Sequence, residues 1–257
     1  MSVRDVLIVG AGPSGLAAAI AAKQQGLDAA IVEQGVLVNG IFNFPVHMVF
    51  FTTPELLEIG GLPLVSPYDK PTRLEALRYY RRVVDAFGLQ IAFHEKVLEI
   101  ESPGPDAKEQ VFTVTTVDGG GVRRVREARA VVLAIGYYDI PNLLGIPGED
   151  LPHVSHYYTD AHPFYRRRVV VVGGKNSAAE AALELFRAGA HVTLVHRRAE
   201  LGDSIKYWVR PDIENRIREG SVRARFNTTV VAITRTTVVV EQQDGRGEEI
   251  QADQSSS

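Results

Sequence analysis

Three glycines near the N-terminus form a pattern that can bind a pyrophosphate. Residues 10–15 read Gly-Ala-Gly-Pro-Ser-Gly and follow directly on the apolar residues 6–9. In a strand–turn–helix unit, the first glycine permits a sharp turn, the second lets backbone amides approach a phosphate, and the third lets the helix pack against the strand. The N-terminus of that helix adds oriented N–H groups and a partial positive charge. The predicted phosphate-binding residues are Gly10, Gly12, Pro13, Ser14 and Gly15.

A carboxylate stands where this kind of unit binds a ribose. Glu33 ends the second apolar segment of the unit, and Gln34 follows it. At this offset from the glycine turn, a carboxylate can accept hydrogen bonds from both ribose hydroxyls of a dinucleotide. An ordinary strand–helix turn is the alternative, but the flanking strands and the terminal acid all fall at the required offsets. We therefore predict a dinucleotide site that includes Glu33 and Gln34.

The same pattern occurs a second time in the chain. Residues 10–35 align without a gap with residues 173–198, and each segment follows four apolar residues that suit a buried parallel strand. Gly26 and Gly189 stand where the two Ala-rich helices should end. The chain therefore predicts strand, turn, helix and strand twice over, which is typical of two Rossmann-like units.

The second copy differs from the first at positions that select the ligand. Lys175 replaces the middle glycine, and Ala178 replaces the last. His196 stands in place of Glu33 and is followed by two arginines, which can bind a 2′-phosphate that a carboxylate would repel. This favours NADPH over NADH as the ligand. The alternative is a solvated basic loop that binds no nucleotide. The predicted contacts are Gly173, Gly174, Lys175, Asn176, Ser177, Ala178, His196, Arg197 and Arg198.

The remaining segments predict the elements that position these two turns. Strands are expected at 111–117, 122–127 and 130–136, and again at 222–226, 228–234 and 237–242, so that each half carries a small β-meander. Residues 72–87 have apolar side chains at helical spacing and are expected to form a core helix. His47 lies in an aromatic segment, where a structural histidine and a ligand-binding one are both open.

Composition narrows the class of protein. The chain has 28 basic and 31 acidic residues, a formal net charge of −3, which does not suggest a nucleic-acid surface or a polybasic membrane contact. No apolar run approaches the roughly 20 residues needed to span a bilayer, and no secretion signal is recognised, so a cytoplasmic protein is expected. With no cysteine among 257 residues, disulfides, thiolate metal sites and a Cys-x-x-Cys redox pair are excluded. We predict no metal site.

With these motifs in view, the chain resembles the thioredoxin-reductase-like flavoproteins, and within them the bacillithiol-disulfide reductase (YpdA-type) branch. Lys175 and Asn176, which are unusual in a Rossmann turn, are similar to that branch. The resemblance runs from residue 3 to about residue 253, and rests on GAGPSGL (10–16), FNFPVHMVFFTT (42–53), KPTRLEALRYYRRVV (70–84), AIGYYDIPN (134–142), HYYTDAHPFY (156–165) and GGKNSAAEAALEL (173–185).

The resemblance implies an α/β protein with two Rossmann-like (three-layer ββα) dinucleotide-binding domains. It implies an FAD domain, 1–153, into which an NADPH domain, 154–250, is inserted, followed by a polar tail, 251–257. It further implies NADPH-dependent reduction of a low-molecular-weight disulfide by a cytoplasmic protein, which we expect to be a homo-oligomer. Besides the first turn and Glu33, the FAD contacts would be Gln34, Asn43, His47, Val97, Gly136 and Tyr137.

Two departures from the family keep other functions open. Ser14 occupies a position where such members commonly carry a cysteine, and a serine cannot form a mixed disulfide, so no catalytic residue is assigned. A C-terminal segment that in relatives returns to the FAD domain is expected to be missing after residue 253. The alternatives are a flavin reductase with another acceptor (ferredoxin, quinone or oxygen), a flavin monooxygenase, and a non-catalytic nucleotide-binding remnant.

Overall fold

The computed structural model describes residues 3–104 and 110–253, which form two compact units that meet between Ile140 and Pro141. The boundary therefore lies before the predicted one at residue 153. The reason is packing within the second unit, where Ile146 joins an apolar cluster with Val230 and Val240. The backbone N–H of Ile233 also donates to the Pro147 carbonyl at 2.8 Å. None of the described helices is long and apolar enough to serve as a membrane span.

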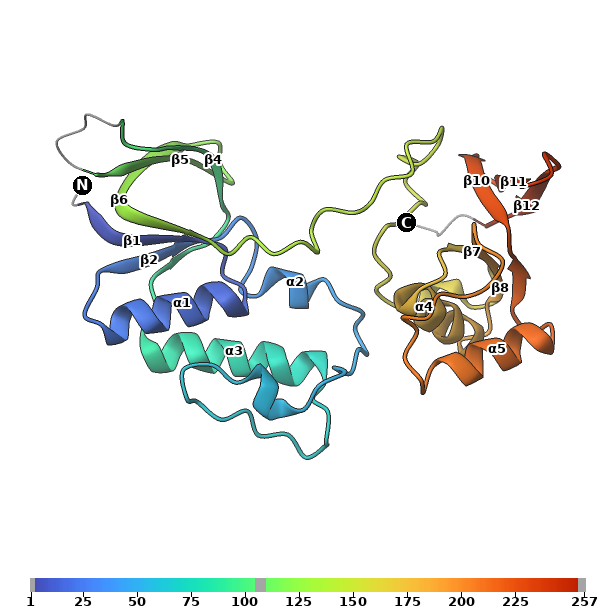
Figure 1. Cartoon of the computed structure of the whole chain (residues 1–257), viewed down its shortest axis with the longest axis horizontal. Helices are drawn as coiled ribbons and strands as arrows, with labels where there is room; N and C mark the ends of the chain where they lie inside the picture. The colour runs from blue at the N-terminus through green and yellow to red at the C-terminus, as the bar shows by residue number, and fades with distance from the viewer. Residues whose placement is uncertain (1–2, 105–109, 254–257) are drawn as a thin grey trace. The chain divides into compact units, whose positions relative to one another are not determined.

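The first unit is built on one six-stranded sheet (Figure 1). Its strand order is β3-β2-β1-β6-β5-β4, with the first four parallel and the last two antiparallel. Buried Leu7 and Val32 pack on the meander through Val114, so this part of the sheet covers the face opposite the helices. The strands are β1 (Arg4–Val9), β2 (Ala29–Val32), β3 (Ile91–Ala92), β4 (Glu95–Glu101), β5 (Phe112–Asp118) and β6 (Arg123–Leu133).

Strand β6 corrects the sequence prediction. Residues 122–127 and 130–136 were expected as separate strands, but β6 runs without a break from Arg123 to Leu133. Its first half pairs with β5 in a hairpin and its second half pairs with β1 in parallel, and Ala128 is paired on both sides. A single long strand therefore carries the chain from the meander into the parallel sheet.

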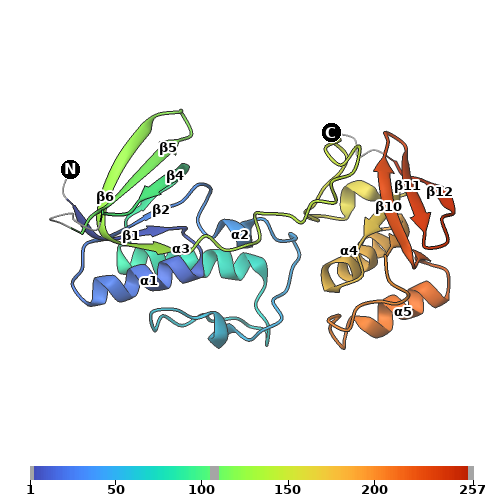
Figure 2. The ribbon, with the colours of Figure 1, turned by 45° about the horizontal axis from the view of Figure 1, so that its top comes forward.

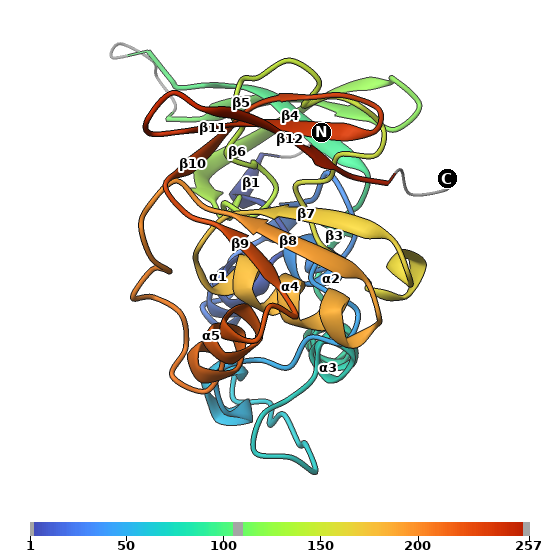
Figure 3. The same ribbon diagram turned by 90° about the vertical axis from the view of Figure 1, so that its right-hand side faces the viewer.

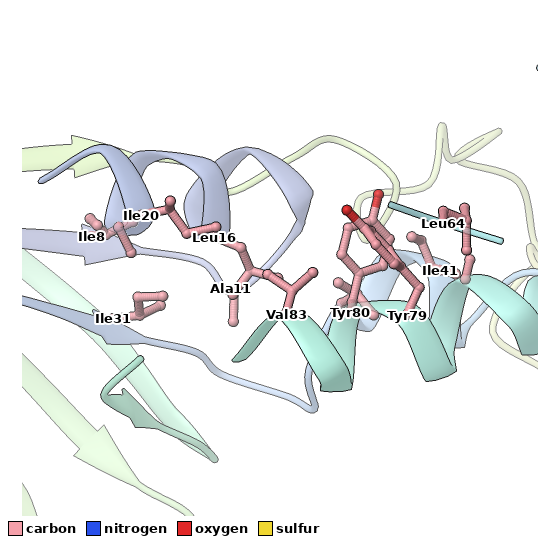
Figure 4. Close-up of a cluster of buried hydrophobic side chains, with 13 residues drawn as sticks. Ile8, Ala11, Leu16, Ile20, Ile31, Ile41, Leu64, Tyr79, Tyr80 and Val83 are labelled. Atoms are coloured by element: carbon pink, nitrogen blue, oxygen red, sulfur yellow. The ribbon is translucent and has the colours of Figure 1, made fainter. Parts of the chain in front are cut away.

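Helices cover the other face of the first sheet. Buried residues of α1 and α3 form one cluster with Ile8, Ile31 and Ala11 of the first glycine turn (Figure 4). Helix α3 begins with a reciprocal capping box between Thr72 and Glu75, which confirms the predicted helix start. The helices are α1 (Pro13–Gln24), α2 (Asn39–Phe42), the 3-10 helix η1 (Pro54–Leu57) and α3 (Arg73–Phe87).

The second unit has three layers. Helices α4 and α5 lie on one face of a parallel sheet of order β7-β8-β9 (Figure 3), and the β10–β12 meander packs on the other (Figure 2). Val192 and Leu194 face the helices, whereas Val195 faces the meander. The elements are η2 (His162–Phe164), β7 (Arg168–Val172), α4 (Asn176–Arg187), β8 (His191–Val195), α5 (Arg210–Arg218), β9 (Arg223–Arg225), β10 (Thr228–Ile233), β11 (Thr237–Gln242) and β12 (Gly247–Gln251).

Candidate functional site

The first glycine turn has the geometry that its spacing predicts. Gly10 has a φ of +106°, and a Cβ on it would overlap the Ala134 carbonyl oxygen. A Cβ on Gly15 would overlap the Gly10 carbonyl oxygen, so this glycine brings α1 against the turn. Nothing lies within 4 Å of a Cβ built on Gly12. Two glycines are therefore needed for packing, and the middle one leaves the backbone open to a ligand.

An open hollow lies directly beside this turn. It has a volume of about 420 Å³ and is lined by Gly12, Pro13, Ser14 and residues 132–136. Gly136, which was predicted as an FAD contact, therefore lies at the same hollow as the glycine turn. The parallel pairing of β6 with β1 places it there. The N-terminus of α1 is at this hollow, because Pro13 is its first residue. Oriented backbone N–H groups and an open space are what a pyrophosphate requires.

Glu33 holds the turn together. It is 6% exposed, and its two carboxylate oxygens accept hydrogen bonds from the N–H groups of Ala11 and Gly35, each at 2.7 Å. Each oxygen has two acceptor sites, so the carboxylate retains the capacity to bind ribose hydroxyls. Its role in positioning the turn was not foreseen from the sequence. Gln34 is exposed next to it.

Val38 is a site residue that the sequence analysis missed. Its backbone is left-handed, with φ 47° and ψ 49°, and its N–H donates to the Ala11 carbonyl at 3.0 Å. A β-branched residue rarely adopts this conformation, and such strain is found where the surrounding structure demands it. The contact holds the segment after Glu33 against the glycine turn. No sequence signal marks it, because valine predicts the opposite backbone preference.

The aromatic segment 42–53 meets the residues that follow β6. Phe44 packs edge-to-face on Tyr138, with ring centroids 4.8 Å apart. Arg73 at the start of α3 donates to the Ile41 and Phe42 carbonyls and lies over the Phe42 ring at 5.4 Å. Among predicted FAD contacts in these two segments, Asn43 is half-buried, whereas His47 and Tyr137 are exposed.

One predicted contact lies apart from the hollow. Val97 on β4 packs with the Leu7 and Val114 cluster between the meander and the parallel strands. It is not among the residues that line the hollow beside the first turn. Its assignment as an FAD contact stays a prediction that rests on the family resemblance.

The second glycine turn packs against a histidine ring. A Cβ on Gly173 would lie 2.9 Å from the Ala178 Cβ, and a Cβ on Gly174 would overlap the His196 ring. His196 therefore packs against the turn. Its Nε2 is buried and has no hydrogen-bond partner among the residues that the structure describes. Burial lowers the pKa of His196, and the positive charges of Arg198 and Arg197 lower it further, so the ring is neutral at pH 7.

The N-terminus of α4 lies at this second turn, as predicted. Asn176, its first residue, accepts a hydrogen bond from the Lys206 N–H at 3.1 Å and donates to Glu180 at 3.0 Å. Asn176 therefore positions the segment before α5, which the sequence analysis did not anticipate. Lys175 and Ser177 are exposed.

The two arginines after β8 are available for a ligand. Arg197 and Arg198 are exposed, and neither guanidinium forms an ion pair with a carboxylate in the described ranges. The Arg198 backbone is fixed, because its carbonyl accepts from the Asn227 N–H at 2.9 Å. Two guanidinium groups that no carboxylate of the described ranges neutralises, near a helix N-terminus, suit a phosphate.

Comparison with known proteins identifies the relatives of this chain. The profile of the family described as pyridine nucleotide-disulphide oxidoreductase matches residues 7–256. Bacilliredoxin reductase Bdr from Bacillus subtilis (strain 168) is 41% identical over 239 residues, which are 93% of this chain and 71% of that protein. Among solved structures, bacillithiol disulfide reductase Bdr (YpdA) from Bacillus cereus is 39% identical with a TM-score of 0.93, covering 98% of this chain and 76% of that one. The Staphylococcus aureus protein of the same description is 39% identical with a TM-score of 0.91, covering 99% and 75%.

Proposed function

The chain belongs to the pyridine nucleotide-disulphide oxidoreductases, and on that premise we propose that it binds FAD and oxidises NADPH to reduce a low-molecular-weight disulfide. The observation that carries the proposal is the difference between its two glycine turns. The first turn borders an open hollow and ends on buried Glu33. The second ends on two exposed arginines that form no ion pair within residues 3–104 and 110–253, which favours a 2′-phosphate.

The residues around the first turn fit the ADP half of FAD. The space above Gly12 admits a pyrophosphate, and the N-terminus of α1 supplies N–H donors and partial positive charge to it. Glu33 would bind the ribose through acceptor sites that Ala11 and Gly35 leave free. When bound, FAD and NADPH supply the redox chemistry, while the protein supplies position and electrostatics.

The residues around the second turn fit NADPH. Gly173, Gly174 and the start of α4 would face the pyrophosphate, and Arg197 and Arg198 would bind the 2′-phosphate in bidentate fashion. In this proposal the second unit is the NADPH domain inserted into the FAD domain. The cytoplasmic location and the homo-oligomeric state of the whole protein stay predictions.

The identity of the electron acceptor is the most specific part of the proposal. The relatives from Bacillus and Staphylococcus are described as bacilliredoxin or bacillithiol disulfide reductases, which supports a low-molecular-weight disulfide here. Because the chain has no cysteine, a protein thiolate cannot form a mixed disulfide with that substrate. The same observation favours a second candidate, a flavin reductase whose acceptor is ferredoxin, a quinone or oxygen.

An anaerobic absorption spectrum before and after addition of NADPH tests the proposal. We expect flavin bands that bleach with NADPH and bleach much less with NADH. Reoxidation of the bleached protein by bacillithiol disulfide, and not by a quinone or ferredoxin, would then identify the acceptor. A colourless protein that remains colourless after incubation with FAD would overturn the flavoenzyme proposal.

A further inference from the structure

The segment between β8 and α5 is docked on the second glycine turn. Leu201, Ile205 and Val209 are buried in the core of the second unit. The Gly202 N–H donates to the Gly174 carbonyl at 2.7 Å, and a Cβ on Gly202 would lie 3.0 Å from that oxygen. The absence of a side chain at residue 202 thus allows two stretches of backbone to meet.

A second set of contacts fixes the end of this segment at the start of α4. The Lys206 N–H donates to the Asn176 side chain at 3.1 Å, and Asn176 is the first residue of α4. Arg210 Nη2 donates to the Gly202 carbonyl at 2.8 Å, which closes the segment on itself. The two residues after Lys206 are therefore held close to the helix end where a pyrophosphate would bind.

Those two residues are large aromatics with exposed surface. Tyr207 is 82% exposed and Trp208 is 40% exposed. Their rings pack edge-to-face, with centroids 4.8 Å apart and an interplanar angle of 87°. Two adjacent aromatic rings with exposed surface, on a backbone held in place by these contacts, form a surface that a planar ligand can cover. Aromatic faces suit planar heteroaromatic rings, on which they stack.

We propose that Tyr207 and Trp208 bind a heteroaromatic ring of the dinucleotide held at the second glycine turn. The inference rests on the proposed function, since it adds a ring-binding surface to the proposed NADPH site. Adenine and nicotinamide offer the same chemistry to the two side chains. The backbone contacts to Gly174 and Asn176 set the pair beside the turn, and the arginines after β8 belong to the same connection between strand and helix.

The chain offers a direct test, because Trp208 is its single tryptophan. We would titrate the purified protein as isolated with NADP⁺, which does not reduce the flavin, and follow tryptophan emission together with calorimetry. We expect a saturable change in emission, and an NADP⁺ affinity about tenfold weaker in Tyr207→Ala, as expected for loss of one stacking partner. A response to adenosine 2′,5′-bisphosphate would assign the adenine ring. A response to NADP⁺ without one to the bisphosphate would assign nicotinamide.

Tyr165→Ala is the matched control. Tyr165 is 57% exposed in the same unit but packs on Gly189, beyond the C-terminal end of α4, so its removal should leave NADP⁺ affinity unchanged. If calorimetry detects NADP⁺ binding while emission stays constant and Tyr207→Ala binds within twofold of wild type, the inference is overturned and the proposed NADPH site stands. If the wild type binds no dinucleotide, both fail. The emission measurement needs no variant and therefore does not depend on the folding of one.

Discussion

The two glycine turns share a backbone plan but differ in the side chain that contacts their second residue. In the first, the Glu33 carboxylate accepts a hydrogen bond from the N–H of Ala11. In the second, the His196 ring packs on Gly174, the residue equivalent to Ala11, and the Gly202 N–H donates to the Gly174 carbonyl. The glycine motif therefore specifies the turn, whereas residues outside the motif determine which side chain contacts it.

The largest expected effect separates packing glycines from the ligand-facing one. Gly15→Ala should destabilise the first unit by about 3 kcal/mol, because the added Cβ would overlap the Gly10 carbonyl and α1 would have to move. Gly12→Ala meets open space and should keep the stability of the wild type while weakening FAD retention. Urea denaturation measures the unfolding free energy of each variant, and flavin absorbance measures how much FAD each variant retains. Equal destabilisation by both substitutions would contradict the assigned roles.

A smaller effect is expected from removing the charge of Glu33. Glu33→Gln keeps the shape of the side chain but places an amide NH₂ where the Ala11 or Gly35 N–H needs an acceptor. Loss of one buried hydrogen bond costs about 1–3 kcal/mol. We expect a lower unfolding free energy and weaker FAD binding than in the wild type. Glu99→Gln, at an exposed position of β4 in the same unit, is the control for a change in charge alone.

Arg198→Gln tests the second glycine turn and its proposed 2′-phosphate site. Removing one guanidinium from the 2′-phosphate site should weaken NADPH binding by roughly tenfold, in line with a charge-assisted hydrogen bond. NADH affinity should stay unchanged, because NADH lacks that phosphate. Arg235→Gln, in the turn between β10 and β11, serves as a matched control. An equal loss for both nucleotides in Arg198→Gln would mean that the residue does not select between them.

The smallest effect concerns His196, which replaces Glu33 in the second turn. Its pKa is lowered in the folded state, so the unfolded chain takes up the proton first as pH falls. The stability that this side chain contributes should be present above the unfolded pKa of about 6.5 and should be lost as pH falls through the folded pKa. Thermal unfolding at pH 7.5 and pH 5.5 should therefore show a larger acid-induced loss in the wild type than in His196→Gln. An equal loss of stability in the wild type and in His196→Gln would show that His196 does not cause it.

Much of the fold was predictable from local pattern. Strand, turn and helix positions follow from apolar runs and from glycines at helix ends, and α3 follows from the helical spacing of its apolar residues. Strand β6 was predicted as two strands because its composition changes near residue 130 from mostly charged to apolar, whereas its pairing to both β5 and β1 depends on distant segments. The unit boundary was misplaced for the same reason, since Ile146 and Pro147 contact β10 more than eighty residues later in the chain.

The candidate site shows the same division between local and distant effects. Asn176 was predicted as a ligand contact from its place after the second glycine turn, yet its side chain holds Lys206. The left-handed backbone of Val38 has no sequence signal, because it accompanies a hydrogen bond to Ala11, which lies 27 positions earlier. Roles that a residue takes through a partner far along the chain were the ones that spacing did not reveal.

The sequence by itself determined that this protein has two strand–turn–helix–strand units with different endings, a carboxylate in one and arginines in the other. These features depend on residues within about thirty positions of each other, which local backbone geometry brings together. Only the tertiary structure decided that Gly136 borders the first turn, that His196 packs on the second, and that the Tyr207–Trp208 pair is held beside it. Those placements depend on strand pairing and on contacts between separate loops, which no local pattern records.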